Sequence, residues 1–284
     1  MGNLRACLVV AIMALSACGN DHAAVDGSVT VPDAPIDAKV WMDAPAPVFD
    51  FSCANNPAPT AATAQITLGG TVQEASIGGG GLTTTPLDNA TVRACKQPST
   101  LDCTMQANRY GSDTTDAQGA FSIGPIPTSS MPLNTYLDMT HTGSRETFLY
   151  PPQPLQADLA NIPMVTFSQT LVSLLGSIPG GCTQNDASNG LLFVAVSDCA
   201  NTAISDSANL QLVIKQGGNV VAGTTVIDLG AQNAQAAGTY IVCNVPANPV
   251  TNVGATYNGM NLLAHDVKIA VGTTTLTAIR PGYF

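Results

Sequence analysis

The residues of this chain with the widest chemistry are its eight cysteines, because a thiol can be acylated, oxidised to a disulfide or bound to a metal. Cys7 and Cys18 lie within and just after an apolar run near the N-terminus. The other six are spread over the rest of the chain. Disulfides form in oxidising compartments, so the role of those six depends on whether the chain is exported.

The N-terminal run predicts export. Arg5 precedes an apolar stretch over 6–15, and small residues follow it. This order is typical of a secretory signal peptide, and the stretch is shorter than the about 20 residues of a membrane-spanning helix. The sequence Leu-Ser-Ala-Cys over 15–18 resembles the lipobox of bacterial lipoproteins. That resemblance implies cleavage between Ala17 and Cys18 and acylation of Cys18, for example with palmitate. Gly19 is not the Asp that retains enteric lipoproteins in the inner membrane, which favours the outer membrane.

Six cysteines remain in the exported chain, an even number that predicts disulfides. Cys95 and Cys103 are the easiest pair, because they close a short loop worth roughly 2–3 kcal/mol in the chain-entropy model. Pairing Cys199 with Cys243, which flank strands of the second half, would leave Cys53 with Cys182. Six cysteines permit 15 pairings, so other connectivities stay open. No C-x-x-C or Cys/His cluster predicts a metal site.

The histidines and acids give no catalytic or metal motif. His22, His141 and His265 are far apart in sequence and belong to no zinc motif. We expect His265 to begin a buried stripe and His141 to lie in a loop. The chain has no G-x-S-x-G nucleophile motif, and its Gly-rich run over 78–81 lacks the Lys of a phosphate loop. The spacing of Asp102, Asp113 and Asp116 does not match a calcium loop, so these acids are predicted to form turns. We therefore predict no cofactor.

Composition excludes a nucleic-acid partner. The formal net charge is −10, with 5% aromatic and 10% charged residues. There is no basic patch to meet phosphates. Abundant Gly and Thr with few charges are typical of a β-rich exported protein.

The expected organisation is a signal peptide, a disordered tether and two β domains. The tether is rich in Pro and Asp, which extend a chain at about 3.1 Å per residue, so it reaches on the order of 100 Å. One apolar patch, formed by 40–42 and 48–51, is expected to dock on a domain with Cys53 as its staple. The predicted ranges are 1–17 signal peptide, 18–62 lipidated Cys and tether, 63–165 first β-sandwich, 166–189 linker with a short helix, and 190–284 second β-sandwich.

Short apolar-alternating segments separated by Gly, Pro and Asn predict antiparallel strands. In the first domain these are 66–72, 91–95, 120–123 and 136–140, with a loop over 78–86. In the second they are 191–196, 209–214, 220–229, 239–245, 250–257, 267–271 and 276–279. Thr166 and Gln169 could form a capping box for a helix over 166–178.

Four segments of the first domain, 69–72, 86–93, 115–123 and 126–127, resemble the carboxypeptidase regulatory-like domain. The second domain resembles a degenerate copy over 194–198, 204–208, 238–242, 244–246 and 253–259. The resemblance implies two transthyretin-like β-sandwiches without catalytic residues. Asp116 and Gly119 then suit a tight hairpin turn, and Phe121 and Ile123 point into the core.

These features predict a non-catalytic, lipid-anchored envelope protein that presents its domains for adhesion or for binding an envelope component. The alternative is a glycan-binding surface lipoprotein. That function needs an exposed cluster of tyrosines. A hydrolase is the third class, and it needs His265 in a cleft with carboxylates and a serine. The sequence does not specify an oligomeric state.

Overall fold

The computed structural model describes residues 48–78, 81–177, 180–231 and 236–283. The predicted signal peptide, Cys18 and most of the predicted tether lie outside these residues. The described chain is mainly β with one short α-helix, as the sequence predicts. No helix in these ranges is long and apolar enough to cross a membrane.

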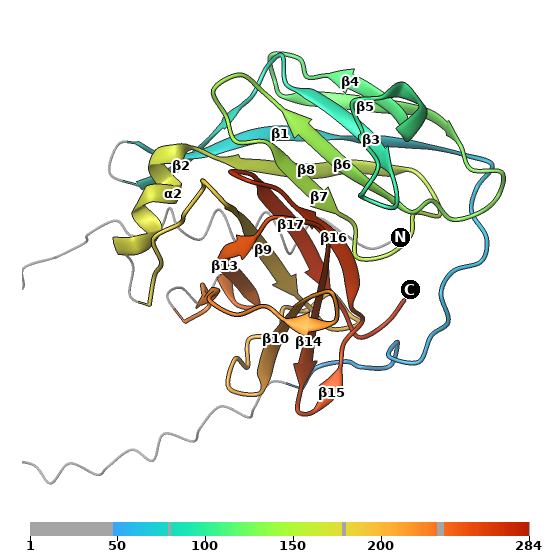
Figure 1. Cartoon of the computed structure of the whole chain (residues 1–284). Coiled ribbons are helices and arrows are strands. Elements are labelled where there is room, and N and C mark those ends of the chain that lie inside the picture. Colours follow the sequence, from blue (N-terminus) through green and yellow to red (C-terminus); the bar gives the residue numbers. More distant parts are fainter. Residues whose placement is uncertain (1–47, 79–80, 178–179, 232–235, 284) are drawn as a thin grey trace, which may run out of the picture.

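A central sheet of eight strands joins the two halves of the chain (Figure 1). β17, the last described strand, pairs in parallel with β7 of the first half and with β9 of the second. Strands predicted to belong to separate domains therefore share one sheet. In spatial order the sheet contains β12 (Thr225–Asp228), β13 (Thr239–Pro246), β9 (Asn189–Val196), β17 (Thr274–Ile279), β7 (Thr147–Tyr150), β6 (Thr135–Thr140), β3 (Thr91–Lys96) and β4 (Arg109–Thr114).

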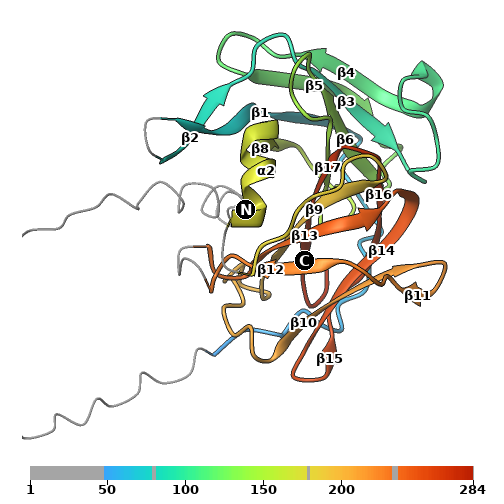
Figure 2. The same ribbon diagram turned by 60° about the vertical axis from the view of Figure 1, so that its left-hand side comes forward.

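Two smaller sheets lie on either side of the central one (Figures 1 and 2). In the first, β1 (Gln65–Gly78) pairs with β2 (Gly81–Pro86) and β5 (Ala120–Pro127), and in parallel with β8 (Leu159–Phe167). The second contains β11 (Asn219–Val220), β10 (Leu210–Gln216), β14 (Asn248–Tyr257), β15 (Met260–Asn261) and β16 (His265–Ile269). We call the two faces of the central sheet the β1 side and the β14 side.

Strand alternation divides the core between these two sides. On β6, Leu137 and Met139 pack on the β1 side with residues of β1 and β5, whereas Tyr136 packs on the β14 side. The short helix α2 (Gln169–Ser173) lies on the β1 side between β1 and β13, and its Val172 is buried there (Figure 2).

The structure corrects the predicted helix. Thr166 belongs to β8, and its hydroxyl donates to the carbonyl of Arg145. Ser168 is the N-cap instead, because its Oγ accepts from the Leu171 N–H at 3.2 Å. A 3₁₀ turn over Leu174–Ser177 follows α2.

Three strand predictions also change. The predicted loop over 78–86 contains β2, and the predicted strand 220–229 is divided into β11 and β12 around Gly223, whose φ is +78°. The predicted turn forms, with the Gly119 N–H donating to the Asp116 carbonyl at 2.8 Å. However, it connects β4 of the central sheet to β5 of the β1 sheet, so it joins two sheets rather than the strands of a hairpin.

Besides β2, the strands β4, β7, β8 and the two-residue β15 were not predicted. β8 contains Pro163, which lacks an N–H and argues against a central strand. Its position at a sheet edge, paired only with β1, accommodates the proline. β4 is polar and β7 has four residues, so neither gives a clear alternation.

Candidate functional site

Three disulfides cross-link the described chain. The predicted Cys95–Cys103 pair is present. The expectations of Cys199 with Cys243 and of Cys53 with Cys182 are wrong, because the structure joins Cys53 to Cys199 and Cys182 to Cys243. Cys243 lies on the β1 side of β13, where the segment after α2 brings Cys182. The position of Cys199 and Cys243 beside strands of the same half therefore did not identify their disulfide partners.

The N-terminal segment 48–56 is fixed to the second half of the chain, as expected for the apolar patch. Phe49 and Phe51 pack on the ring of Tyr257 at centroid distances of 5.6 and 5.3 Å. The Cys199 N–H donates to the Asp50 carbonyl at 2.8 Å, beside the Cys53–Cys199 bond. The chain from the N-terminus thus meets the fold at β14 and at the loop after β9, before it reaches β1.

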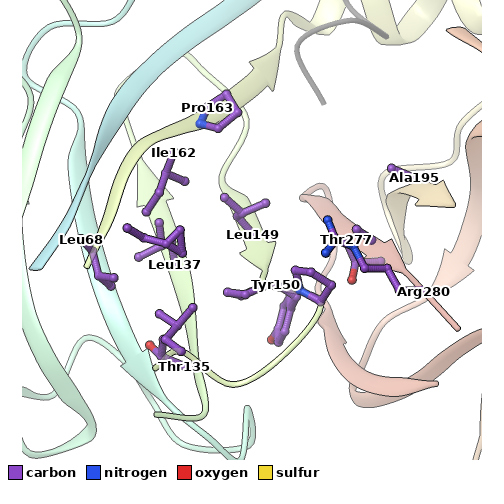
Figure 3. A pocket seen from close by; sticks show the side chains of 15 residues that line it. Leu68, Thr135, Leu137, Leu149, Tyr150, Ile162, Pro163, Ala195, Thr277 and Arg280 are labelled. Carbon is purple, nitrogen blue, oxygen red and sulfur yellow. The ribbon is translucent and has the colours of Figure 1, made fainter. Parts of the chain in front are cut away.

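An apolar cavity lies between the β1 sheet and the central sheet (Figure 3). Its enclosed space is about 80 Å³, and it opens to solvent. Leu68 and Ile162 from β1 and β8 face Leu137 and Leu149 from β6 and β7. The mostly apolar lining with few polar groups resembles that of small-molecule pockets, whereas the enclosed volume is smaller than usual for them.

Arg280 is the charged residue of this cavity wall. It is 7% exposed and lies opposite Leu68 and Ile162 (Figure 3). Its carbonyl accepts from the Leu263 N–H at 2.7 Å, which fixes the backbone just after β17. An arginine keeps its charge even when it is buried.

A more polar cleft of about 110 Å³ adjoins the cavity. Both are lined by Thr135, Pro151 and Pro152. The polar side chains of the cleft include His265 and Asn134. The apolar cavity and the polar cleft therefore lie next to each other.

His265 is the notable titratable group of the cleft. Its Nε2 is hydrogen bonded to the Thr277 hydroxyl, and burial lowers its pKa to about 4, so the ring is neutral at pH 7. The residues that line the cleft include no carboxylate and no serine. These lining residues therefore do not bring His265 together with carboxylates and a serine, which a hydrolase would need.

A cluster of charged residues on the β14 side was not predicted. Arg93 on β3 lies opposite Asp138 on β6, with 3.4 Å between its Nη1 and the carboxylate. Burial raises the pKa of Asp138 despite the nearby Arg93 and Lys268. Burial, followed by the charge of Asp138, also raises the pKa of Glu146.

This cluster has a structural rather than a catalytic setting. Neither the cavity nor the cleft is lined by any of its four residues. It could have been noticed from Asp138, an acid inside the otherwise apolar segment 136–139. Its partners Arg93, Glu146 and Lys268 come from three other strands or strand ends, and no local pattern connects them.

The remaining candidates have local roles. The His141 Nδ1 is hydrogen bonded to the Ser144 hydroxyl at 2.9 Å, in the loop after β6. Asp102 and Asp116 accept backbone N–H groups from their own turns, as predicted, whereas Asp113 lies on β4 rather than in a turn and accepts the Ser122 N–H of β5. Among the described residues, the one group with metal-type ligands is Cys95, Cys103 and Asp138, and its cysteines are already joined.

The tyrosines do not form an exposed platform. Tyr136, Tyr150, Tyr240 and Tyr257 are buried, and the two others are half-buried. Stacking of sugar rings needs exposed aromatic faces, so the described residues do not supply the cluster that a glycan-binding function needs.

No family model matches the sequence, and no curated protein sequence matches it. Solved structures with similarity include the shaft pilin SpaA from Lactobacillus rhamnosus GG, at 10% identity and a TM-score of 0.23, covering 78% of this chain and 99% of that one. The minor pilin GBS52 of Streptococcus agalactiae has 13% identity and a TM-score of 0.21, with 77% and 96% covered. The Bacillus anthracis TIE protein has 12% identity and a TM-score of 0.22, with 76% and 33% covered. These low TM-scores do not assign a function to this chain.

Proposed function

We propose that this chain is a non-catalytic envelope protein, lipid-anchored through Cys18, that presents a disulfide-linked β body for adhesion or for binding an envelope component. The observation that carries the proposal is the attachment of the N-terminal segment at Cys53–Cys199. A covalent attachment at this point suits a body that is held from its N-terminal side.

Sequence features support the anchoring part of the proposal. The lipobox-like segment ends at Cys18, and a Pro- and Asp-rich stretch separates it from Phe49. Two or more acyl chains anchor a protein stably, whereas one gives marginal binding. Three disulfides are consistent with an oxidising compartment outside the cytoplasm. The outer membrane is the proposed location, on the basis of Gly19.

The test is to express the full precursor in a bacterium and to compare it with Cys18→Ser and Cys7→Ser. The unaltered chain and Cys7→Ser should both fractionate with membranes and yield an acylated N-terminal Cys18 by mass spectrometry. Cys18→Ser should lack the acyl mass and either remain uncleaved or appear in the soluble fraction. If Cys18→Ser is cleaved and fractionates with membranes as the unaltered chain does, the lipid anchor is excluded.

A further inference from the structure

We propose that the cavity between the β1 sheet and the central sheet binds a free single-chain amphipathic carboxylate, with its apolar chain in the cavity and its carboxylate at Arg280. This inference goes beyond the proposed envelope function and does not depend on lipid anchoring, since it uses only folded residues.

The cavity selects the apolar part of the ligand. Leu68, Leu137, Leu149 and Ile162 converge on it from four strands of two sheets (Figure 3). Transfer of an alkyl chain from water into such a space is favourable by about 0.8 kcal/mol for each buried CH₂. The enclosed space of about 80 Å³ takes part of a short chain, and the rest of the chain lies in the open mouth.

Arg280 selects the charge of the ligand. The polar groups of the wall, Arg280 included, have protein partners: the Thr135 hydroxyl donates to the Cys95 carbonyl at 2.7 Å, and the Tyr150 hydroxyl accepts from the Lys268 N–H at 2.9 Å. The Thr277 hydroxyl is bonded to His265. A guanidinium has five N–H donors in a planar fork that fits a carboxylate, so it can donate to a ligand in addition to its protein contacts.

The polar cleft gives the carboxylate a polar neighbourhood. It shares Thr135, Pro151 and Pro152 with the cavity, and Leu263, whose N–H donates to the Arg280 carbonyl, lines it. The Arg280 backbone is therefore hydrogen bonded to a residue that lines the polar cleft. An apolar ligand without an anionic group would make no charged contact with Arg280.

The experiment is calorimetric titration of the full chain carrying Cys18→Ser, so that no acyl chain of its own competes. Octanoate, octanol and octylammonium are the probes, since they share one chain and differ in charge. Octanoate should bind most tightly. Arg280→Gln should weaken octanoate binding about tenfold or more, because charge-assisted hydrogen bonds are lost, and should change octanol binding by less than about threefold.

Ala278→Leu is the second variant, because it fills the cavity without altering its charge; it should weaken octanoate and octanol alike. Lys215→Gln, outside the cavity, is the matched charge control and should change neither. Near-UV circular dichroism checks that each variant is folded. If Arg280→Gln does not fold, the proposal is still tested by Ala278→Leu and by the relative affinities of the three probes for the unaltered cavity.

Absence of octanoate binding at millimolar concentration, or equal binding of octanoate and octanol, would overturn the proposal. Arg280-dependent co-sedimentation with phosphatidylglycerol vesicles, without octanoate binding, would also overturn it, because the ligand would then be a membrane surface. Each of these results leaves acylation of Cys18 unaffected, so the anchor and the ligand site are tested separately.

Discussion

The two sides of the central sheet are built from the same strands but differ in chemistry. On β6, Leu137 and Met139 face an apolar interior that contains the cavity, whereas Asp138 faces a packed interior with Arg93 close by. His265 and Thr277 also belong to the β14 side. The Arg93–Asp138 pair and the His265–Thr277 contact lie on the β14 side, whereas the β1 side contains the apolar cavity, with Arg280 in its wall, and the Arg145–Asp186 ion pair. We therefore expect ligand binding on the β1 side and the acid sensitivity that His265 causes on the β14 side.

The largest expected effect compares a disulfide on each side. Replacing Cys182 and Cys243 with Ala on the β1 side opens a loop with a sequence separation of 61, and should lower the free energy of unfolding by about 4 kcal/mol. The same change at Cys95 and Cys103 on the β14 side, with a separation of 8, should cost about 2–3 kcal/mol. Urea denaturation measures both; an equal or reversed order would contradict the prediction.

Arg93→Leu should destabilise the β14 side by about 3 kcal/mol at pH 7, because it leaves the buried Asp138 carboxylate without its nearest cation. Met139→Leu, on the β1 side of the same sheet, conserves the side-chain volume and should lower the free energy of unfolding by less than about 1.5 kcal/mol. Chemical denaturation of both variants tests this contrast. A smaller loss for Arg93→Leu than for Met139→Leu would show that the ion pair contributes little.

His265 should make the β14 side sensitive to acid. Its folded pKa, about 4, lies below the ordinary value of about 6.5, so the unfolded chain binds more protons between these values. Stability should therefore fall as the pH decreases through this window, by about 2 kcal/mol between pH 6.5 and 5. His265→Gln should remove this loss in unfolding curves measured across the window. An unchanged slope in that variant would contradict the assignment.

Asp138 and Glu146 should act in the opposite direction and more weakly. Their folded pKa values are raised, so the folded chain binds more protons from pH 4 upward to those values. Their contribution favours folding at low pH and is lost as the pH rises. Glu146→Gln should flatten this part of the curve, most clearly in the background of His265→Gln. If Glu146→Gln steepens the fall of stability with rising pH, the carboxyl pair is not arranged as described.

Local patterns predicted the strands better than their partners. Alternation identified β10 and β16, because one side of each strand is more buried than the other and period-2 alternation is a local property. The parallel pairing of β17 with β7 joins residues more than a hundred positions apart, and no local pattern encodes it. Arg280 was missed for the same reason, since it becomes a cavity residue only when β17 is placed beside β7. Cys95–Cys103 was predicted because its loop is short, whereas the two long-range disulfides depend on which side of the central sheet each thiol faces.

The bond between Cys53 and Cys199 has a mechanical consequence. It closes residues 53–199 into a covalent loop with a sequence separation of 146. If the chain is held at its N-terminus and pulled from its C-terminal half, tension passes through the sulfur atoms and bypasses β1, β3 and β6. Most of the first half, including most of the cavity lining, would then carry no load while the disulfide is intact. Reduction of this single bond would transfer the force to β1, so the oxidation state of Cys53 would set which strands resist stretching.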